Sequence, residues 1–190
     1  KDYIKGRCIC IALFFMLVTE MFEIKKFDLN NIITNKNLEN QSIEYLKKNP
    51  CCKAFPNCTH PKYQSDPNLW TNENFYFLNK KIYEIICDSY NKILNIRCNM
   101  WVYYQEQNTI LEKPEWHNHV FEDNDHQLSF LIYLSPTDLG TMFENESKIS
   151  IITPETNVFY LWNSRINHSP QVGKNNKNRV VLAGACSIYL

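Results

Sequence analysis

Two histidines stand one residue apart in the segment Trp116-His117-Asn118-His119, in a chain of 190 residues with five histidines. A run rich in β-branched and aromatic residues follows them, so we expect the pair to lie on a strand. Residues i and i+2 of a strand face the same side, which would make His117 and His119 project together. Two imidazoles placed in this way can bind one metal ion. Alone, the pair also fits two surface histidines on an edge strand.

Three further polar or charged residues follow in an order that gives the pair more weight. Tyr133 comes sixteen residues after His117, in the segment LSFLIYLS. His168 follows an aromatic segment, and Arg179 opens the last apolar segment eleven residues later. Taken one at a time, Arg179 fits a surface charge at a strand end and Tyr133 fits a core aromatic.

The order of these residues resembles that of the 2-oxoglutarate- and iron(II)-dependent oxygenases, particularly the prolyl-hydroxylase-like members and their bacterial and phage relatives. The family pattern is His-x-Asp/Glu, a strand ending in Tyr-Leu-Asn, a Gly-Glu-Thr-x-Phe turn, a Pro-xx-Gly-x-Leu-x-x-Phe segment, then a distal His and an Arg. Here His117 falls on the first ligand, residues 140–143 on the turn and residues 154–162 on the proline-to-phenylalanine segment. The resemblance covers about residues 99 to 190.

The resemblance implies a metal site, a cosubstrate site and a reaction. His117, His119 and His168 would hold Fe(II) on one face and leave positions open for 2-oxoglutarate and O₂. Arg179 would pair with the far carboxylate of 2-oxoglutarate, and Tyr133 would add a hydrogen bond to it. No catalytic residue beyond the metal ligands is expected. The implied function is a dioxygenase, a hydroxylase acting on a peptide side chain or a small molecule.

The chain departs from the family pattern at the second ligand. His119 stands where the family has Asp or Glu, and three-histidine iron sites are chemically reasonable. Halogenating members carry a small residue here, so His119 disfavours halogenation. Glu122, Asp123 and Asp125 follow in the same loop and could supply a carboxylate instead.

Two other functions remain open from the sequence. A His-x-His pair with a distant histidine is also the ligand set of hydrating zinc enzymes. A non-catalytic β-barrel binding protein that has lost its metal is the third hypothesis. Arg179 and Tyr133 separate these cases, because only the oxygenase needs an anchor for a dicarboxylate.

Composition narrows the partners. Lys plus Arg and Asp plus Glu number 20 each, which removes the electrostatic argument for nucleic acid or an anionic membrane. The eight cysteines follow no regular secreted framework, so we expect reduced thiols and a cytoplasmic protein. The segment CCKAFPNCTH at 51–60 lacks zinc-site spacing and favours a plain loop over a metal site.

The predicted elements give an α+β protein. Apolar spacing predicts a short helix over 41–48 and a longer one over 73–95. Short strands after residue 98 predict a sandwich or barrel, and the resemblance specifies a double-stranded β-helix (a jelly-roll, cupin-like barrel) over 99–190 with the N-terminal helices packed outside. Residues 21–98 would belong to the same domain. Residues 1–20 contain an apolar run too short to span a bilayer, which leaves a leader, a short element or an upstream artefact open.

Overall fold

The computed structural model describes residues 23–31, 33, 36–51, 63–90, 93–120, 127–145 and 148–189. Three sequence-based expectations fall outside these ranges. They concern the segment 1–20, most of the cysteine-rich loop, and the alternative carboxylate ligands Glu122, Asp123 and Asp125.

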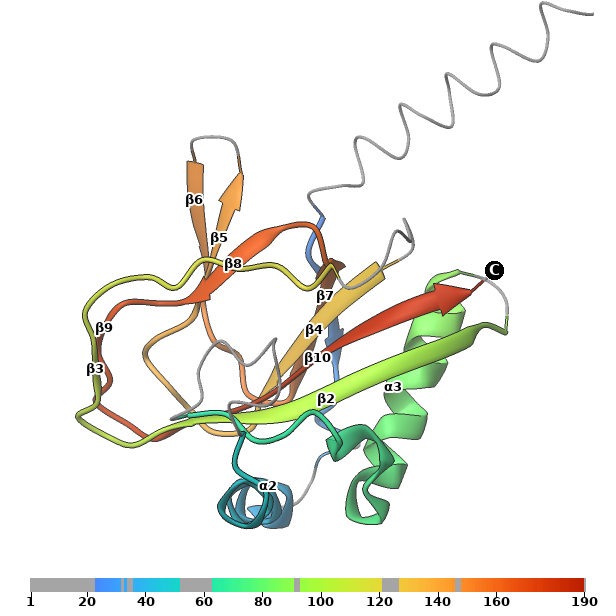
Figure 1. The fold of residues 1–190 in the computed structure, drawn as a ribbon, viewed down its shortest axis with the longest axis horizontal. Helices are drawn as coiled ribbons and strands as arrows, with labels where there is room; N and C mark the ends of the chain where they lie inside the picture. The colour runs from blue at the N-terminus through green and yellow to red at the C-terminus, as the bar shows by residue number, and fades with distance from the viewer. Residues whose placement is uncertain are drawn as a thin grey trace, which may run out of the picture.

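Two antiparallel sheets form the body of the described structure (Figure 1). The larger sheet has five strands, in the order β1 (Lys25–Asp28), β7 (Val158–Asn163), β4 (Gln127–Tyr133), β10 (Arg179–Tyr189) and β2 (Asn95–Gln105). The smaller sheet has three, in the order β6 (Lys148–Ile152), β5 (Thr141–Asn145) and β8 (Asn167–Pro170). A short ladder joins β3 (Ile110–Leu111) to β9 (Gly173–Lys174).

The five-stranded sheet is buried on both faces, because successive side chains of β10 point alternately into two different cores. Val180 and Leu182 belong to a core that includes both helices, α2 (Lys36–Lys48) and α3 (Tyr76–Ser89). Val181 faces the other way, into a second core that contains Phe143 of the smaller sheet. The helices therefore cover one face of the larger sheet, and the smaller sheet covers the other, as expected for helices packed outside a β structure.

The longer helix is shorter than its sequence pattern predicts. Asn72 accepts a hydrogen bond from the backbone N–H of Asn74 at 3.0 Å and so caps a 3₁₀ turn (Glu73–Phe75) that leads into α3. The helix ends at Ser89, and Ile93 is 89% exposed. The prediction that it continues to residue 95 is wrong because the chain must turn there to start β2.

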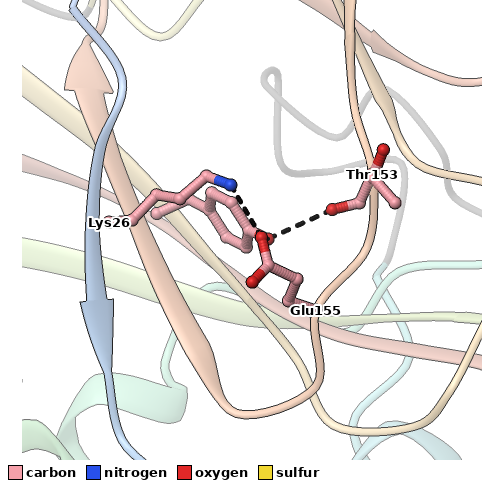
Figure 2. Close-up of polar contacts among 4 residues, drawn as sticks. Lys26, Thr153 and Glu155 are labelled. Carbon is pink, nitrogen blue, oxygen red and sulfur yellow. Dashed lines mark hydrogen bonds and ion pairs between the residues drawn. The ribbon is translucent and has the colours of Figure 1, made fainter.

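Strand β1 was not foreseen, because its sequence Lys-Lys-Phe-Asp is short and polar. It pairs antiparallel with β7, and Lys26 lies opposite Tyr160 in that pairing. The Lys26 ammonium is 2.6 Å from a carboxylate oxygen of Glu155, and the Tyr160 hydroxyl donates to the carbonyl oxygen of Thr153 at 3.2 Å (Figure 2). The ion pair attaches β1 to the segment that leads into β7, and the Tyr160 hydrogen bond joins that segment to β7 itself. The exposed Lys26 lowers the pKa of the Glu155 carboxyl, chiefly through their hydrogen bond.

A disulfide joins Cys98 of β2 to Cys186 of β10, which corrects the expectation of reduced thiols. The two residues face each other across the ladder, with Cα atoms 4.2 Å apart. Their separation of 88 residues hid this proximity from the sequence. Cys51 is also disulfide-bonded, and Cys87 is a buried free thiol. Within the described ranges, no helix is both long and apolar enough to cross a membrane.

Candidate active site

Backbone pairing places the three histidines around one point. His117 and His168 face each other in an isolated antiparallel bridge. Each backbone N–H donates to the carbonyl oxygen of the other residue, with nitrogen-to-oxygen distances of 3.1 and 2.9 Å. Side chains of such facing residues project to the same side. The backbone N–H of His119 donates a hydrogen bond to the carbonyl oxygen of Ser164 at 3.1 Å. This bond holds the second histidine beside the turn that precedes β8. The regular strand expected around His117 is only this bridge. The two-residue spacing still turns the side chains of His117 and His119 to the same side.

The side chains converge as the sequence predicts. One ring nitrogen from each of His117, His119 and His168 lies within 4.8 Å of the others. The ring centroids are 4.5 to 5.0 Å apart. His119 and His168 are buried, and His117 is partly buried. Within the described part of the chain, no Asp or Glu joins this group.

Hydrogen bonds to backbone carbonyls orient two of the rings. Nδ1 of His117 lies 2.9 Å from the carbonyl oxygen of Glu115, and Nδ1 of His168 lies 3.2 Å from that of Ile166. Because a carbonyl can only accept, Nδ1 carries the proton in each neutral ring and Nε2 keeps its lone pair. Burial lowers the pKa of His117, which favours this neutral form. Neutral imidazole with a free nitrogen is the form that binds metals.

Arg179, the first residue of β10, is a buried cation without a counter-charge among the described residues. It is 2% exposed. Its guanidinium donates to the carbonyl oxygen of Gly140 at 2.8 Å, to Thr141 Oγ1 at 3.3 Å and to Gln105 Oε1 at 3.4 Å. No carboxylate among the described residues forms an ion pair with it, and its Nε has no hydrogen-bond partner there. An isolated buried charge is costly, so a counter-charge from outside the described residues would stabilise this side chain.

Tyr133 lies beside this cation. It is fully buried, and the Arg179 guanidinium carbon is 5.8 Å from the centre of its ring. Its hydroxyl is 2.8 Å from Thr141 Oγ1. Burial raises the pKa of Tyr133, so it stays protonated and can donate a hydrogen bond. Thr141 connects the two predicted residues, and sequence reasoning gave it no role, although it stands in the Gly140–Phe143 motif.

The histidines and Arg179 line one cavity between the sheets, together with Thr141. Trp101 and Tyr103 of β2 and Trp162 of β7 form aromatic walls. Gln64, which precedes a 3₁₀ turn at Leu69–Thr71, also reaches the cavity. Tyr104 follows Tyr103 in β2, but alternation along the strand turns Tyr104 toward the helices. Trp101 and Gln64 were missed, because the pairing that brings them here is long-range.

Comparison with known proteins gives a likeness of structure alone. No protein-family model and no curated protein matches the sequence. A prolyl-4-hydroxylase from Pseudomonas putida matches with a TM-score of 0.55 and 13% identity, over 90% of this chain and 94% of that one. HygX from Streptomyces hygroscopicus with iron bound matches with a TM-score of 0.56 and 9% identity, over 90% and 85%. The chain shares their fold.

AviO1 from Streptomyces viridochromogenes gives a TM-score of 0.53 at 9% identity. The match covers 66% of each chain, so this chain spans just under two thirds of AviO1. The sequence predicted an α+β protein with a double-stranded β-helix. The coarser part of that prediction, a mostly β structure with few helices, is confirmed, and the chain shares this fold with the prolyl-4-hydroxylase and HygX.

Proposed function

We propose that the chain is a 2-oxoglutarate- and Fe(II)-dependent dioxygenase that hydroxylates a peptide side chain or a small molecule. One observation carries this proposal. A buried arginine, for which the described residues offer no counter-charge, lines the same cavity as three converging histidines. A zinc hydratase needs the histidines but has no use for Arg179, and a binding module that has lost its metal needs neither.

The three histidines fit a resident metal ion. Three neutral imidazoles on one side of an ion leave positions open on the other side, which suits Fe(II) and other divalent transition metals. Bound Fe(II) would supply the activation of O₂ coupled to the decarboxylation of 2-oxoglutarate. The protein's part is to fix the ring orientations, through Glu115 and Ile166, and to keep His119 and His168 buried.

The surroundings of Arg179 fit one end of a dicarboxylate. The Arg179 guanidinium can donate two hydrogen bonds to a carboxylate, and its Nε is without a partner among the described residues. The hydroxyls of Tyr133 and Thr141 stand next to it. A solved structure of HygX has nickel and 2-oxoglutarate bound, which supports binding of a divalent metal ion together with 2-oxoglutarate here.

The overall reaction balances as follows. A substrate C–H bond becomes C–OH, 2-oxoglutarate becomes succinate and CO₂, and one atom of O₂ enters each organic product. Among the described residues that line the cavity, Arg179 alone carries a fixed charge. The part of the substrate that enters is therefore expected to be uncharged, against Trp101 and Tyr103. The balanced charge of the chain supports a partner other than nucleic acid.

The strand order supports assigning the two sheets to a double-stranded β-helix. The bridge between His117 and His168 adds the histidine segment to the smaller sheet as its fourth member, next to β8. We assign the catalytic core to residues 99–190. Residues 21–98 are assigned to the same domain, which the pairing of β1 with β7 supports. A cytoplasmic location remains a sequence-based prediction.

Anaerobic spectroscopy tests the proposal. Fe(II) and 2-oxoglutarate added together to the metal-free protein should produce a weak visible charge-transfer band that neither gives alone. Glutarate, which has both carboxylates but no keto group, is the matched control and should give no band. A protein that binds Zn(II) tightly but gives no band with Fe(II) and 2-oxoglutarate would favour the zinc enzyme.

A further inference from the structure

Trp162 of β7 carries a buried donor that the described part of the chain does not satisfy. Its side chain is 3% exposed and lines the cavity. Its indole Nε1 has no hydrogen-bond partner among the described residues. Buried donors without partners are rare in folded proteins, and each one calls for an explanation.

The indole lies at the histidine end of the cavity. Its ring meets the ring of His168 edge-on, with centroids 5.2 Å apart and planes at 75°. It meets Phe143 in the same way, at 5.1 Å and 87°, and Phe143 in turn stacks on His168. These contacts hold the indole in one orientation beside a proposed metal ligand.

Sheet register separates Trp162 from the arginine end. Trp162 lies opposite Ser129 of β4, whereas Tyr133, next to Arg179, is four residues further along the same strand. At about 3.3 Å per residue, this places the two positions roughly 13 Å apart along β4. The N–H groups of Arg179 can therefore donate to one end of a bound ligand, and the indole N–H of Trp162 can donate to the other end.

Three buried side-chain nitrogens in this region can only donate and have no partner among the described residues. They are Trp162 Nε1, Arg179 Nε and the side-chain nitrogen of Gln105, whose oxygen accepts from Arg179. A ligand with an acceptor oxygen at each end would match the donors of Trp162 and Arg179.

We propose that the Trp162 indole N–H donates a hydrogen bond to the carboxylate of the bound 2-oxo acid that lies next to the metal. This assignment rests on the proposed function and adds a cosubstrate-binding residue to it. A carboxylate on the metal would keep lone pairs for further hydrogen bonds, and a donor held in a fixed orientation would fix the rotation of that group. Trp162 would thus orient the metal-proximal end, while Arg179 holds the distal end.

The substitution Trp162→Phe is a suitable probe. Phenylalanine keeps an aromatic ring between His168 and Phe143 but has no N–H. The family motif that this segment resembles ends in phenylalanine at the corresponding position, so the barrel can accommodate it. Trp70→Phe is the matched control, because Trp70 packs against Phe130 on the helix-facing side of the larger sheet.

Nuclear magnetic resonance of ¹⁵N-tryptophan-labelled protein reads the hydrogen bond directly. The chain has four tryptophans, and the Trp162→Phe spectrum identifies the Trp162 indole signal by its loss. With Zn(II) as a diamagnetic metal, 2-oxoglutarate should shift that indole proton downfield, whereas Zn(II) alone should not. Calorimetry should show 2-oxoglutarate binding to Trp162→Phe weakened by about tenfold to a hundredfold, as for loss of a hydrogen bond to a charged group. Trp70→Phe should bind like the wild type, and metal affinity should be equal in all three proteins.

Two results would overturn the assignment, and they differ from each other. If 2-oxoglutarate binds the wild type and Trp162→Phe equally and the indole signal stays in place, Trp162 has no role in binding and the proposed function stands. If metal-loaded wild type binds no 2-oxoglutarate, the proposed function fails and the assignment of Trp162 fails with it.

Discussion

Replacing Arg179 by methionine should remove cosubstrate binding while leaving the metal site intact. Methionine approximates the volume of the side chain but has no donors. The guanidinium makes three hydrogen bonds to Gly140, Thr141 and Gln105, yet no described carboxylate offsets its charge. A bound dicarboxylate would supply that charge. Truncating one partner of a buried, hydrogen-bonded charge pair costs about 2–5 kcal/mol. The expected loss of 2-oxoglutarate affinity is therefore roughly 30- to 4,000-fold.

Arg179→Met should weaken 2-oxoglutarate binding but should not lower the stability of the ligand-free protein. Without ligand, Arg179 is 2% exposed and has no counter-charge among the described residues, which costs free energy of folding. Arg179→Met removes that cost, so the ligand-free variant should unfold at a midpoint no lower than that of the wild type. A variant that merely damaged the fold would instead lower the midpoint and weaken metal binding as well.

Anaerobic calorimetry with Fe(II)-loaded protein measures the first effect, and thermal unfolding of the metal-free protein measures the second. Arg165→Met is the matched control, because it removes the same charge from an exposed turn between β7 and β8. Unchanged 2-oxoglutarate affinity in Arg179→Met would refute the role given to Arg179. The three-histidine zinc enzyme would then be the better account of the cavity.

Three further predictions concern the histidines and the disulfide. His119→Ala should weaken metal binding by at least tenfold in a competition assay, whereas His119→Asp, which places a carboxylate ligand at the same position, should keep metal binding. Burial lowers the pKa of His117 in the folded state, so the unfolded chain binds more protons below about pH 6.5. The metal-free protein should therefore lose stability as the pH falls through that range. Thermal unfolding of a His117→Gln variant should show a smaller loss. Reducing the bond between Cys98 and Cys186 should lower the free energy of unfolding by about 2–4 kcal/mol. Mass spectrometry of protein isolated without reductant should find that bond, and free thiols at both positions would instead support the cytoplasmic prediction.

The facing of the histidines was predictable because it depends on local geometry. His117 and His119 share a side through their two-residue spacing, although the structure forms a single bridge there and not a regular strand. His168, Tyr133 and Arg179 came from the order of motifs along the chain. The resemblance also implied that Arg179 is buried, but it did not give the hydrogen bonds of Arg179 to Gly140, Thr141 and Gln105.

The features that the sequence missed depend on strand register between distant segments. Thr141 touches Arg179 because the Gly140–Phe143 segment crosses the end of β10. Cys98 meets Cys186 only once β2 and β10 align over eleven pairs of residues. The unsatisfied N–H of Trp162 is a property of what surrounds it on every side, and no periodicity reports that. The short polar strand β1 has no apolar pattern of its own and forms where β7 offers an edge.

A crystal structure of the protein grown anaerobically with Fe(II) and 2-oxoglutarate tests the central claim most directly. We predict an anomalous iron signal among His117, His119 and His168, with the keto acid end of 2-oxoglutarate on the metal and its far carboxylate on Arg179. Metal bound elsewhere, or an oxo acid that does not reach Arg179, would contradict the proposal that these two groups of residues form one oxygenase site.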